Sequence, residues 1–199
     1  MTEAQLLIAT DEYLKSGVHI GTKFKTKYMR HFIYKTRDDG LSVLNLKKID
    51  QRIDIAAKFM SHYAPEDIIL VSRRENGWKP ITLFGQATGA RVFPGRYPPG
   101  MMTNPVLETF TEAKLLVVVD SWPDRNAVND ALELGIPIIA LCDTNNQANG
   151  LDLVIPSNNK GKKALGLVFW LLAREYMKRR GLIKADADFK YKVDDFTAQ

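Results

Sequence analysis

Cysteine and histidine are scarce in this chain of 199 residues, which has one cysteine and three histidines. Cys142 has no partner for an internal disulfide, and it lies in an apolar stretch where a buried thiol is usually structural. His19, His31 and His62 have no cysteine at metal-ligand spacing, so we expect no metal site. We find no leader-like segment with a basic start and an apolar middle. These features favour a reducing compartment, and we expect the cytosol.

Long apolar runs are also missing. The longest strongly apolar run without a charge covers ten residues, 164–173, whereas a membrane-spanning helix needs about 20. We therefore expect no transmembrane segment and no membrane partner.

Glycine-rich phosphate-binding motifs are absent as well. The first buried strand runs into Arg73 and Arg74 instead of a G-x-G-x-x-G turn, and no G-x-x-x-x-G-K-[ST] run occurs. Asp120 and Asp143 follow later strands, where a carboxylate can hold Mg²⁺ or accept a phosphoryl group. Those positions equally suit turns and helix caps, as does Asp124, and we prefer that interpretation. We expect no catalytic residue, no cofactor and no small-molecule substrate, and keep an enzyme as the alternative.

Basic residues, by contrast, are abundant and unevenly placed. The formal net charge is +5, from 28 Lys plus Arg against 23 Asp plus Glu. Residues 15–37 hold seven basic residues and no acid, and residues 160–184 hold eight basic residues against one acid. Residues 38–159, with 11 basic and 15 acidic residues, are net negative. Two cationic segments on a slightly acidic body are typical of a protein that binds a polyanion, although a solvated charged face is the plainer alternative.

Apolar periodicity predicts a three-layer α/β domain over residues 1–184. We expect a short helix within 2–15, a hairpin of strands 32–35 and 41–44 around Gly40, and a helix over 47–63 capped by Asn45. Five short apolar runs then alternate with helices, as in a doubly wound parallel sheet. The strands are expected at 68–72, 91–93, 115–120, 136–142 and 153–155, and the helices at 76–89, 124–134 and 160–180. Residues 185–199 are predicted to be a loose polar tail.

The two cationic segments supply the candidate RNA-binding residues. The first is an arm-and-hairpin segment, residues 15–45, in which cations alternate with Phe24, Tyr28 and Phe32, either to stack on bases or to form one side of a helical turn. In the second, three lysines stand at the start of the last helix, where they oppose the helix dipole unless an anion binds there. Ser157, Asn158 or Asn159 is expected to cap that helix. The full candidate set is Lys23, Lys25, Lys27, Arg30, Lys35, Arg37, Arg73, Arg74, Arg91, Arg96, Asn158, Asn159, Lys160, Lys162 and Lys163.

Four motifs resemble the small ribosomal subunit protein two family. They are SGVHIGT at 16–22, PPGMMTNP at 98–105, LGIPIIALCDT at 134–144 and IPSNNKG at 155–161. The resemblance covers about residues 10–183. It implies a flavodoxin-like five-stranded parallel sheet of order 2-1-3-4-5 with an added N-terminal helix and β-hairpin. It also implies a structural, non-catalytic role on the solvent side of the small subunit, where the head and body meet.

One departure narrows the resemblance to a branch of the family. Bacterial members insert a long helical coiled coil after the threonine-asparagine motif, whereas here Thr103-Asn104 runs almost directly into the next strand. That resembles the archaeal and eukaryotic branch. Eukaryotic members are also described as laminin-receptor precursors with a long acidic extension. We expect no cell-surface role here, because the segment matching their laminin-binding region looks buried and no acidic extension follows it, and we expect an archaeal source.

The sequence thus predicts a structural constituent of the small ribosomal subunit in the cytoplasm, with rRNA and neighbouring small-subunit proteins as its partners. A protein-interaction module anchored by exposed Trp78, Tyr97 and Trp122 remains a second alternative, compatible with RNA binding.

Overall fold

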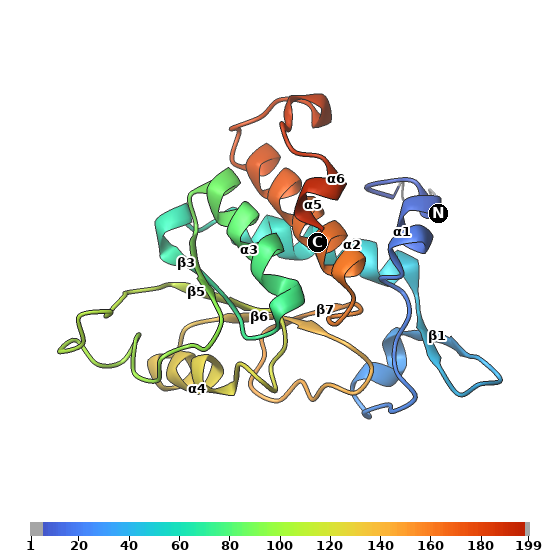
Figure 1. Cartoon of the computed structure of the whole chain (residues 1–199), viewed down its shortest axis with the longest axis horizontal. Coiled ribbons are helices and arrows are strands. Elements are labelled where there is room, and N and C mark those ends of the chain that lie inside the picture. The colour runs from blue at the N-terminus through green and yellow to red at the C-terminus, as the bar shows by residue number, and fades with distance from the viewer. Residues whose placement is uncertain (1–5, 198–199) are drawn as a thin grey trace.

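A five-stranded parallel sheet lies at the centre of the computed structural model, which describes residues 6–197 (Figure 1). Its strands are β3 (Ile68–Ser72), β4 (Arg91–Pro94), β5 (Leu115–Val118), β6 (Ile138–Cys142) and β7 (Leu153–Pro156). Their order is β4-β3-β5-β6-β7, which becomes 2-1-3-4-5 when these five strands are numbered along the chain. All neighbouring pairs are parallel. The α/β class and the strand order implied by the family resemblance are confirmed.

Helices cover both faces of the sheet and explain why its strands are so apolar. α2 (Leu46–Met60), α3 (Glu75–Thr88) and α5 (Lys162–Arg179) lie on one face, and α4 (Arg125–Leu134) lies on the other (Figure 1). Every residue of β3, β5 and β6 is buried between these layers. Each buried aliphatic side chain contributes about 1.5–3 kcal/mol of transfer free energy, so these central strands anchor the core.

α5 is the buried helix that its composition predicts. From Ala164 to Tyr176 all of its residues except Trp170 are buried, packed against α2 and α3. Arg174 and Glu175 are buried as an ion pair of 2.9 Å, and the Arg174 guanidinium also lies over the Trp170 ring. These two charges of α5 therefore neutralise each other within the helix layer.

An antiparallel hairpin precedes the sheet, as expected. β1 (Ile33–Thr36) pairs with β2 (Ser42–Leu44), and Gly40 adopts the left-handed conformation with a φ of 85° in the turn between them. Asn45 then caps α2, because its side-chain oxygen accepts the N–H groups of Lys47 and Lys48 at 3.0 and 3.4 Å. The 3-10 helix η1 (Met29–Phe32) leads into β1, and η2 (Pro65–Asp67) leads into β3.

The N-terminal helix is shorter than predicted and is anchored differently. α1 spans Thr10–Ser16, while residues 1–5 lie outside the described part of the chain. Leu14 is exposed, and the buried side chain is Tyr13, whose hydroxyl donates to Asp50 Oδ1 on α2 at 2.6 Å. The main-chain N–H of Leu7 donates to the same oxygen at 2.9 Å. A buried carboxylate therefore holds this helix in place.

The C-terminal segment is not a loose tail, so that expectation was wrong. η3 (Asp186–Asp188) and α6 (Val193–Phe196) follow α5, and both Phe189 and Phe196 are buried. The Trp170 indole donates to the main-chain oxygen of Tyr191 at 2.8 Å. A few aromatic side chains in a polar segment are enough to fold the chain back onto α5, which a count of apolar residues overlooks.

Within residues 6–197, no helix is long and apolar enough to cross a membrane.

Candidate nucleic-acid interface

The segments that follow the parallel strands form one edge of the sheet, which we call the carboxyl edge. Open α/β sheets bind ligands there, so it is the natural place for a catalytic site. Asp120 and Asp143 do lie there, both buried, but each faces a cation from a distant part of the chain. Asp120 pairs with Arg74, and Asp143 Oδ2 pairs with Lys160 Nζ at 2.9 Å. Asn146 Nδ2 also donates to Asp120 Oδ1 at 2.7 Å.

These pairs leave little room for phosphoryl or metal chemistry. A carboxylate that accepts a phosphoryl group or holds Mg²⁺ must present a free oxygen to solvent, whereas these oxygens are covered by the protein's own cations. In the described part of the chain, no group of three His, Cys, Asp or Glu side chains is placed to hold a metal ion. Burial also raises the pKa of the Cys142 thiol, which keeps it protonated and unreactive.

Asp124 differs from the other two carboxylates in having one oxygen without a partner. Its Oδ1 accepts the main-chain N–H of Arg73 at 2.9 Å, while its buried Oδ2 has no hydrogen-bond partner. Burial raises its pKa to about 6. It occupies the N-cap position of α4, as expected, but its side chain makes no capping hydrogen bond there. The side chain instead joins the end of β3 to the start of α4.

Four cations of the first basic segment project from a firmly held backbone. We call this run, residues 23–30, the basic arm; its cations Lys23, Lys25, Lys27 and Arg30 are exposed. Thr22 N–H donates to Thr144 Oγ1 at 2.9 Å, and Thr26 donates from its main-chain N–H to Thr144 O and from its hydroxyl to Asn146 O, both at 2.9 Å. Thr144 and Asn146 belong to the loop after β6, so the basic arm is fastened to the carboxyl edge.

The sequence left two roles open for Phe24, Tyr28 and Phe32, which could stack on bases or form one side of a helical turn. The structure gives these residues different environments. Phe32 is 3% exposed and belongs to the core, whereas Phe24 is 79% exposed. Tyr28 is half-exposed and contacts the rings of His31 and Phe32. The stacking role is therefore open to Phe24 and closed to Phe32.

The hairpin continues the cationic surface with Lys35 and Arg37, both exposed. Arg37 lies 3.4 Å from Asp39 across the turn, and Lys25 of the basic arm donates to Thr36 Oγ1 at 2.6 Å. An exposed ion pair such as Arg37–Asp39 contributes little to stability.

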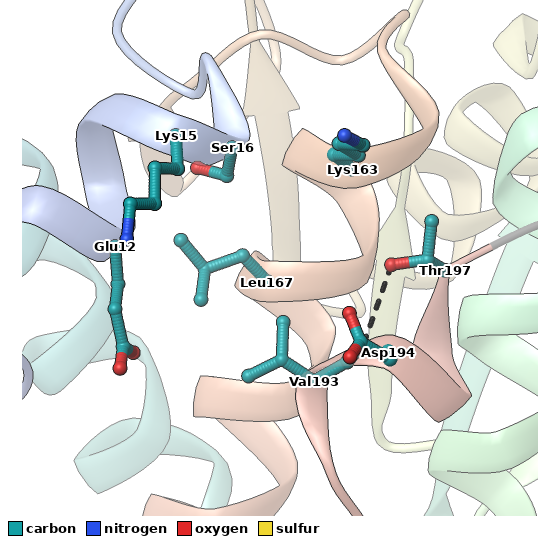
Figure 2. A pocket seen from close by; sticks show the side chains of 8 residues that line it. All are labelled: Glu12, Lys15, Ser16, Lys163, Leu167, Val193, Asp194 and Thr197. Atoms are coloured by element: carbon teal, nitrogen blue, oxygen red, sulfur yellow. Dashed lines mark hydrogen bonds between the residues drawn. The ribbon is translucent and has the colours of Figure 1, made fainter.

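The second group of lysines does not share one environment. Lys160 pairs with Asp143, as described above. Lys163 faces a hollow of about 340 Å³ between α1, α5 and α6 (Figure 2). The hollow is lined by Glu12, Lys15, Ser16, Lys163, Leu167, Val193, Asp194 and Thr197. Lys15 and Lys163 are balanced by Glu12 and Asp194 in this lining, so the hollow favours neither an anionic nor a cationic ligand. Lys162 is exposed in the first turn of α5.

The two asparagines before α5 have structural roles. Asn159 is fully buried, with its amide donating to Leu141 O and Asn146 Oδ1, both at 3.2 Å. Asn159 therefore cannot contact RNA from this position, contrary to the prediction from the sequence. Asn158 Oδ1 accepts the N–H groups of Lys160 and Gly161, each at 3.0 Å, which closes the turn before α5. Neither residue is the N-cap, a position that Gly161 occupies.

The four candidate arginines fall at opposite edges of the sheet. Arg73 follows β3 at the carboxyl edge and is exposed, while the neighbouring Arg74 is engaged with Asp120. Arg96 lies beyond β4, where the N–H of Gly95 donates to Ser72 O at 2.8 Å. Arg91 opens β4 at the amino edge and donates to Glu112 O at 3.1 Å. Arg91 therefore does not share a surface with Arg73.

Arg125, a cation of the carboxyl edge, is absent from the sequence-based candidate set. It is exposed at the first position of α4, directly after the Asp124 that accepts from Arg73. Its neighbour Trp122, which we had considered only as a protein anchor, is 80% exposed. The available signal was position: Trp122 lies between a parallel strand and the next helix, and Arg125 is the first residue of that helix.

Comparisons with known proteins identify the family of the chain. The model of a family described as ribosomal protein S2 matches residues 13–114 and 106–178. The chain belongs to the ribosomal protein S2 family. It is 45% identical over 197 residues to small ribosomal subunit protein uS2 of Thermoplasma acidophilum, covering 99% of both chains. It is 50% identical over 184 residues to uS2 of Ignicoccus hospitalis, covering 92% of this chain and 87% of the relative.

A third relative, uS2 of Nanoarchaeum equitans, is 45% identical over 190 residues, covering 96% of this chain and 94% of the relative. These relatives place the chain in the archaeal branch of the S2 family, as expected from the short segment after Thr103-Asn104. Ribosomal protein S2 is a structural and not an enzymatic family. The ion pairs at the carboxyl edge agree with that, because they occupy the place where an α/β enzyme would bind its substrate.

Proposed function

We propose that this chain is a structural constituent of the small ribosomal subunit in the cytoplasm that binds rRNA through the basic arm and the adjoining carboxyl edge of its sheet. Membership of the ribosomal protein S2 family supports the ribosomal role. The family resemblance further supports a place near the junction of head and body, with neighbouring small-subunit proteins as additional partners.

The observation that carries the rRNA proposal is the basic arm. In the described part of the chain, Lys23, Lys27 and Arg30 have no carboxylate within 4.0 Å. Their backbone is nevertheless fixed by hydrogen bonds from Thr22 and Thr26 to the loop after β6. A row of cations without carboxylate partners gains no ion-pair stabilisation from the rest of the fold. It does present a preorganised surface to phosphates, whose counterions are released on binding.

The test is the salt dependence of rRNA affinity in the full chain. The triple variant Lys23→Ala, Lys25→Ala, Lys27→Ala removes three phosphate contacts, and each contact contributes about 0.7–0.9 to the slope of log affinity against log salt. We expect the slope to fall by about 2–3 with no loss of thermal stability, measured by filter binding to small-subunit rRNA between low and high salt.

The matched control replaces Lys184, Lys190 and Lys192, which are also exposed and belong to the segment between α5 and α6. In Figure 1 this red segment lies at the top of the molecule, whereas the blue segment that contains the basic arm lies at the bottom. It removes the same net charge and should leave the slope almost unchanged. Equal losses in both triple variants would mean that only net charge matters and would refute a specific surface at the basic arm.

A further inference from the structure

Trp122 is a large, solvent-exposed aromatic side chain at the carboxyl edge. It is 80% exposed, and its main-chain N–H donates to Asp120 Oδ1 at 3.1 Å. Asp120 is itself buried and fixed by Arg74 and Asn146, and Pro123 restricts the backbone on the other side. An indole exposed on such a rigid support loses little conformational entropy when a ligand covers it.

Two arginines flank this indole. Arg125 follows it by three positions at the start of α4, and Arg73 is brought alongside because its main-chain N–H donates to Asp124 Oδ1 at 2.9 Å. Both are exposed, and in the part of the chain that the structure describes neither has a carboxylate within 4.0 Å. The carboxylates of Asp120 and Asp124 in the same segment are buried, so the exposed charges that these segments contribute beside Trp122 are the two guanidinium groups.

The basic arm reaches the same region through the loop after β6. Ser121 Oγ donates to Gln147 O at 3.4 Å, and Thr26 Oγ1 donates to Asn146 O at 2.9 Å. In Figure 1 this loop is the orange segment that runs along the lower side of the molecule between α4 and the N-terminal region. Thr26 of the basic arm and Ser121, the residue before Trp122, therefore contact neighbouring residues of one loop. A nucleic-acid strand that lies along this loop would pass both the arm and Trp122.

We propose that Trp122, Arg73 and Arg125 form a stacking platform for one unpaired base of the small-subunit rRNA. The base lies on the indole face, and the two guanidinium groups contact the phosphates on either side of it. Every base has a π-face, so the platform requires an unpaired nucleotide but no particular sequence. A paired helix would keep its bases stacked and would offer Trp122 only its backbone. This proposal rests on the proposed function, since it places a base at the edge where the basic arm binds phosphates.

The charge around the indole favours RNA over a protein as the occupant. A tryptophan that anchors a protein interface is typically surrounded by contacts that exclude water, whereas arginines without counterions suit phosphates. The exposed neighbours in the loop after β6, Asn145 and Gln147, are polar.

The experiment measures binding of the full chain to small-subunit rRNA transcribed in vitro. Base–aromatic stacking of typical strength predicts that Trp122→Ala lowers affinity about five- to hundred-fold, while Trp122→Phe keeps most of it. Because stacking releases few counterions, Trp122→Ala should leave the salt slope unchanged. Arg73→Ala and Arg125→Ala should each reduce that slope by about 0.7–0.9. The matched control is Leu134→Ala, which removes an exposed apolar side chain from the other end of α4.

The outcomes separate this proposal from the one on which it rests. Trp122→Ala binding within two-fold of the parent chain, with the parent retaining its steep salt slope, would overturn the platform and leave the rRNA role intact. Failure of the parent chain itself to bind rRNA would overturn both. Unchanged RNA affinity with reduced incorporation of Trp122→Ala into subunits that contain the other ribosomal proteins would identify a protein as the occupant, which also overturns the platform.

Discussion

Single residues at the carboxyl edge show how a site suited to catalysis is instead used for structure. Arg74 and Lys160 are cations that sequence alone offers to RNA, yet their partners Asp120 and Asp143 lie 46 and 17 positions away. Removing either cation would leave a buried carboxylate unpaired, which typically lowers the free energy of unfolding by about 3–5 kcal/mol. Because both cations are partly exposed, we expect a loss at the lower end of this range. A change at Arg74 or Lys160 therefore tests stability before it tests RNA binding.

Asp124 gives a prediction at this scale, about the pH dependence of stability. Its pKa is raised from 3.8 to about 6 by burial, so the native state binds this proton more tightly than the unfolded state does. The resulting stabilisation is complete below about pH 4 and is lost as the pH rises through about 6, because the ionised carboxylate is then buried with one oxygen unpartnered.

Asp124→Asn removes this titration and keeps an acceptor for the Arg73 N–H. Relative to the variant, we expect the parent chain to lose about 2–3 kcal/mol of unfolding free energy between pH 4 and pH 7.5. Urea unfolding of both proteins across that range measures the difference. A difference that stays constant with pH would show that Asp124 titrates at its ordinary value.

At the scale of elements, a close contact at a glycine determines how α6 packs against α5. Gly166 lies within α5, where an added Cβ would come within 3.1 Å of the Phe196 main-chain oxygen and 3.0 Å of Thr197 Oγ1 on the segment of α6. Glycine in a helix interior costs about 1 kcal/mol relative to alanine, so its presence here is explained by the approach of α6.

Gly166→Ala should therefore favour α5 itself and displace α6 from it. We expect faster hydrogen exchange and easier proteolysis in residues 189–197, with α5 still protected. Ala173→Gly, a change to glycine elsewhere on the same helix, should weaken α5 without the selective release of α6. Unchanged protection of residues 189–197 in Gly166→Ala would contradict the packing described for α6.

Features that depend on neighbouring residues could be predicted from the sequence, whereas contacts between residues far apart in the chain could not. Apolar runs and Asn45 suffice for β3, the start of α2 and the burial of α5, because periodicity and capping are properties of neighbouring residues. The packing of Phe189 and Phe196, the anchoring of Tyr13 by Asp50 and the burial of Asn159 depend on residues far apart in the chain. No short sequence window contains that information.

For the whole molecule, the family resemblance implied the strand order that composition and periodicity could not. The sequence shows where the cationic segments lie, but which of their side chains remain open to a ligand becomes visible only with the fold. In the described part of the chain, Lys23, Lys27 and Arg30 of the basic arm have no carboxylate partner, whereas Lys160 forms an ion pair with Asp143. The fold therefore concentrates the RNA-binding proposal on the basic arm, Arg73 and the start of α4.

The most direct test of the central claim is sedimentation of native lysate through a sucrose gradient in low salt with Mg²⁺, with immunodetection of this chain before and after ribonuclease treatment. An rRNA-binding constituent of the small subunit should migrate with small subunits and move to the top of the gradient once the RNA is digested. A chain that remains at the top without ribonuclease would contradict the account.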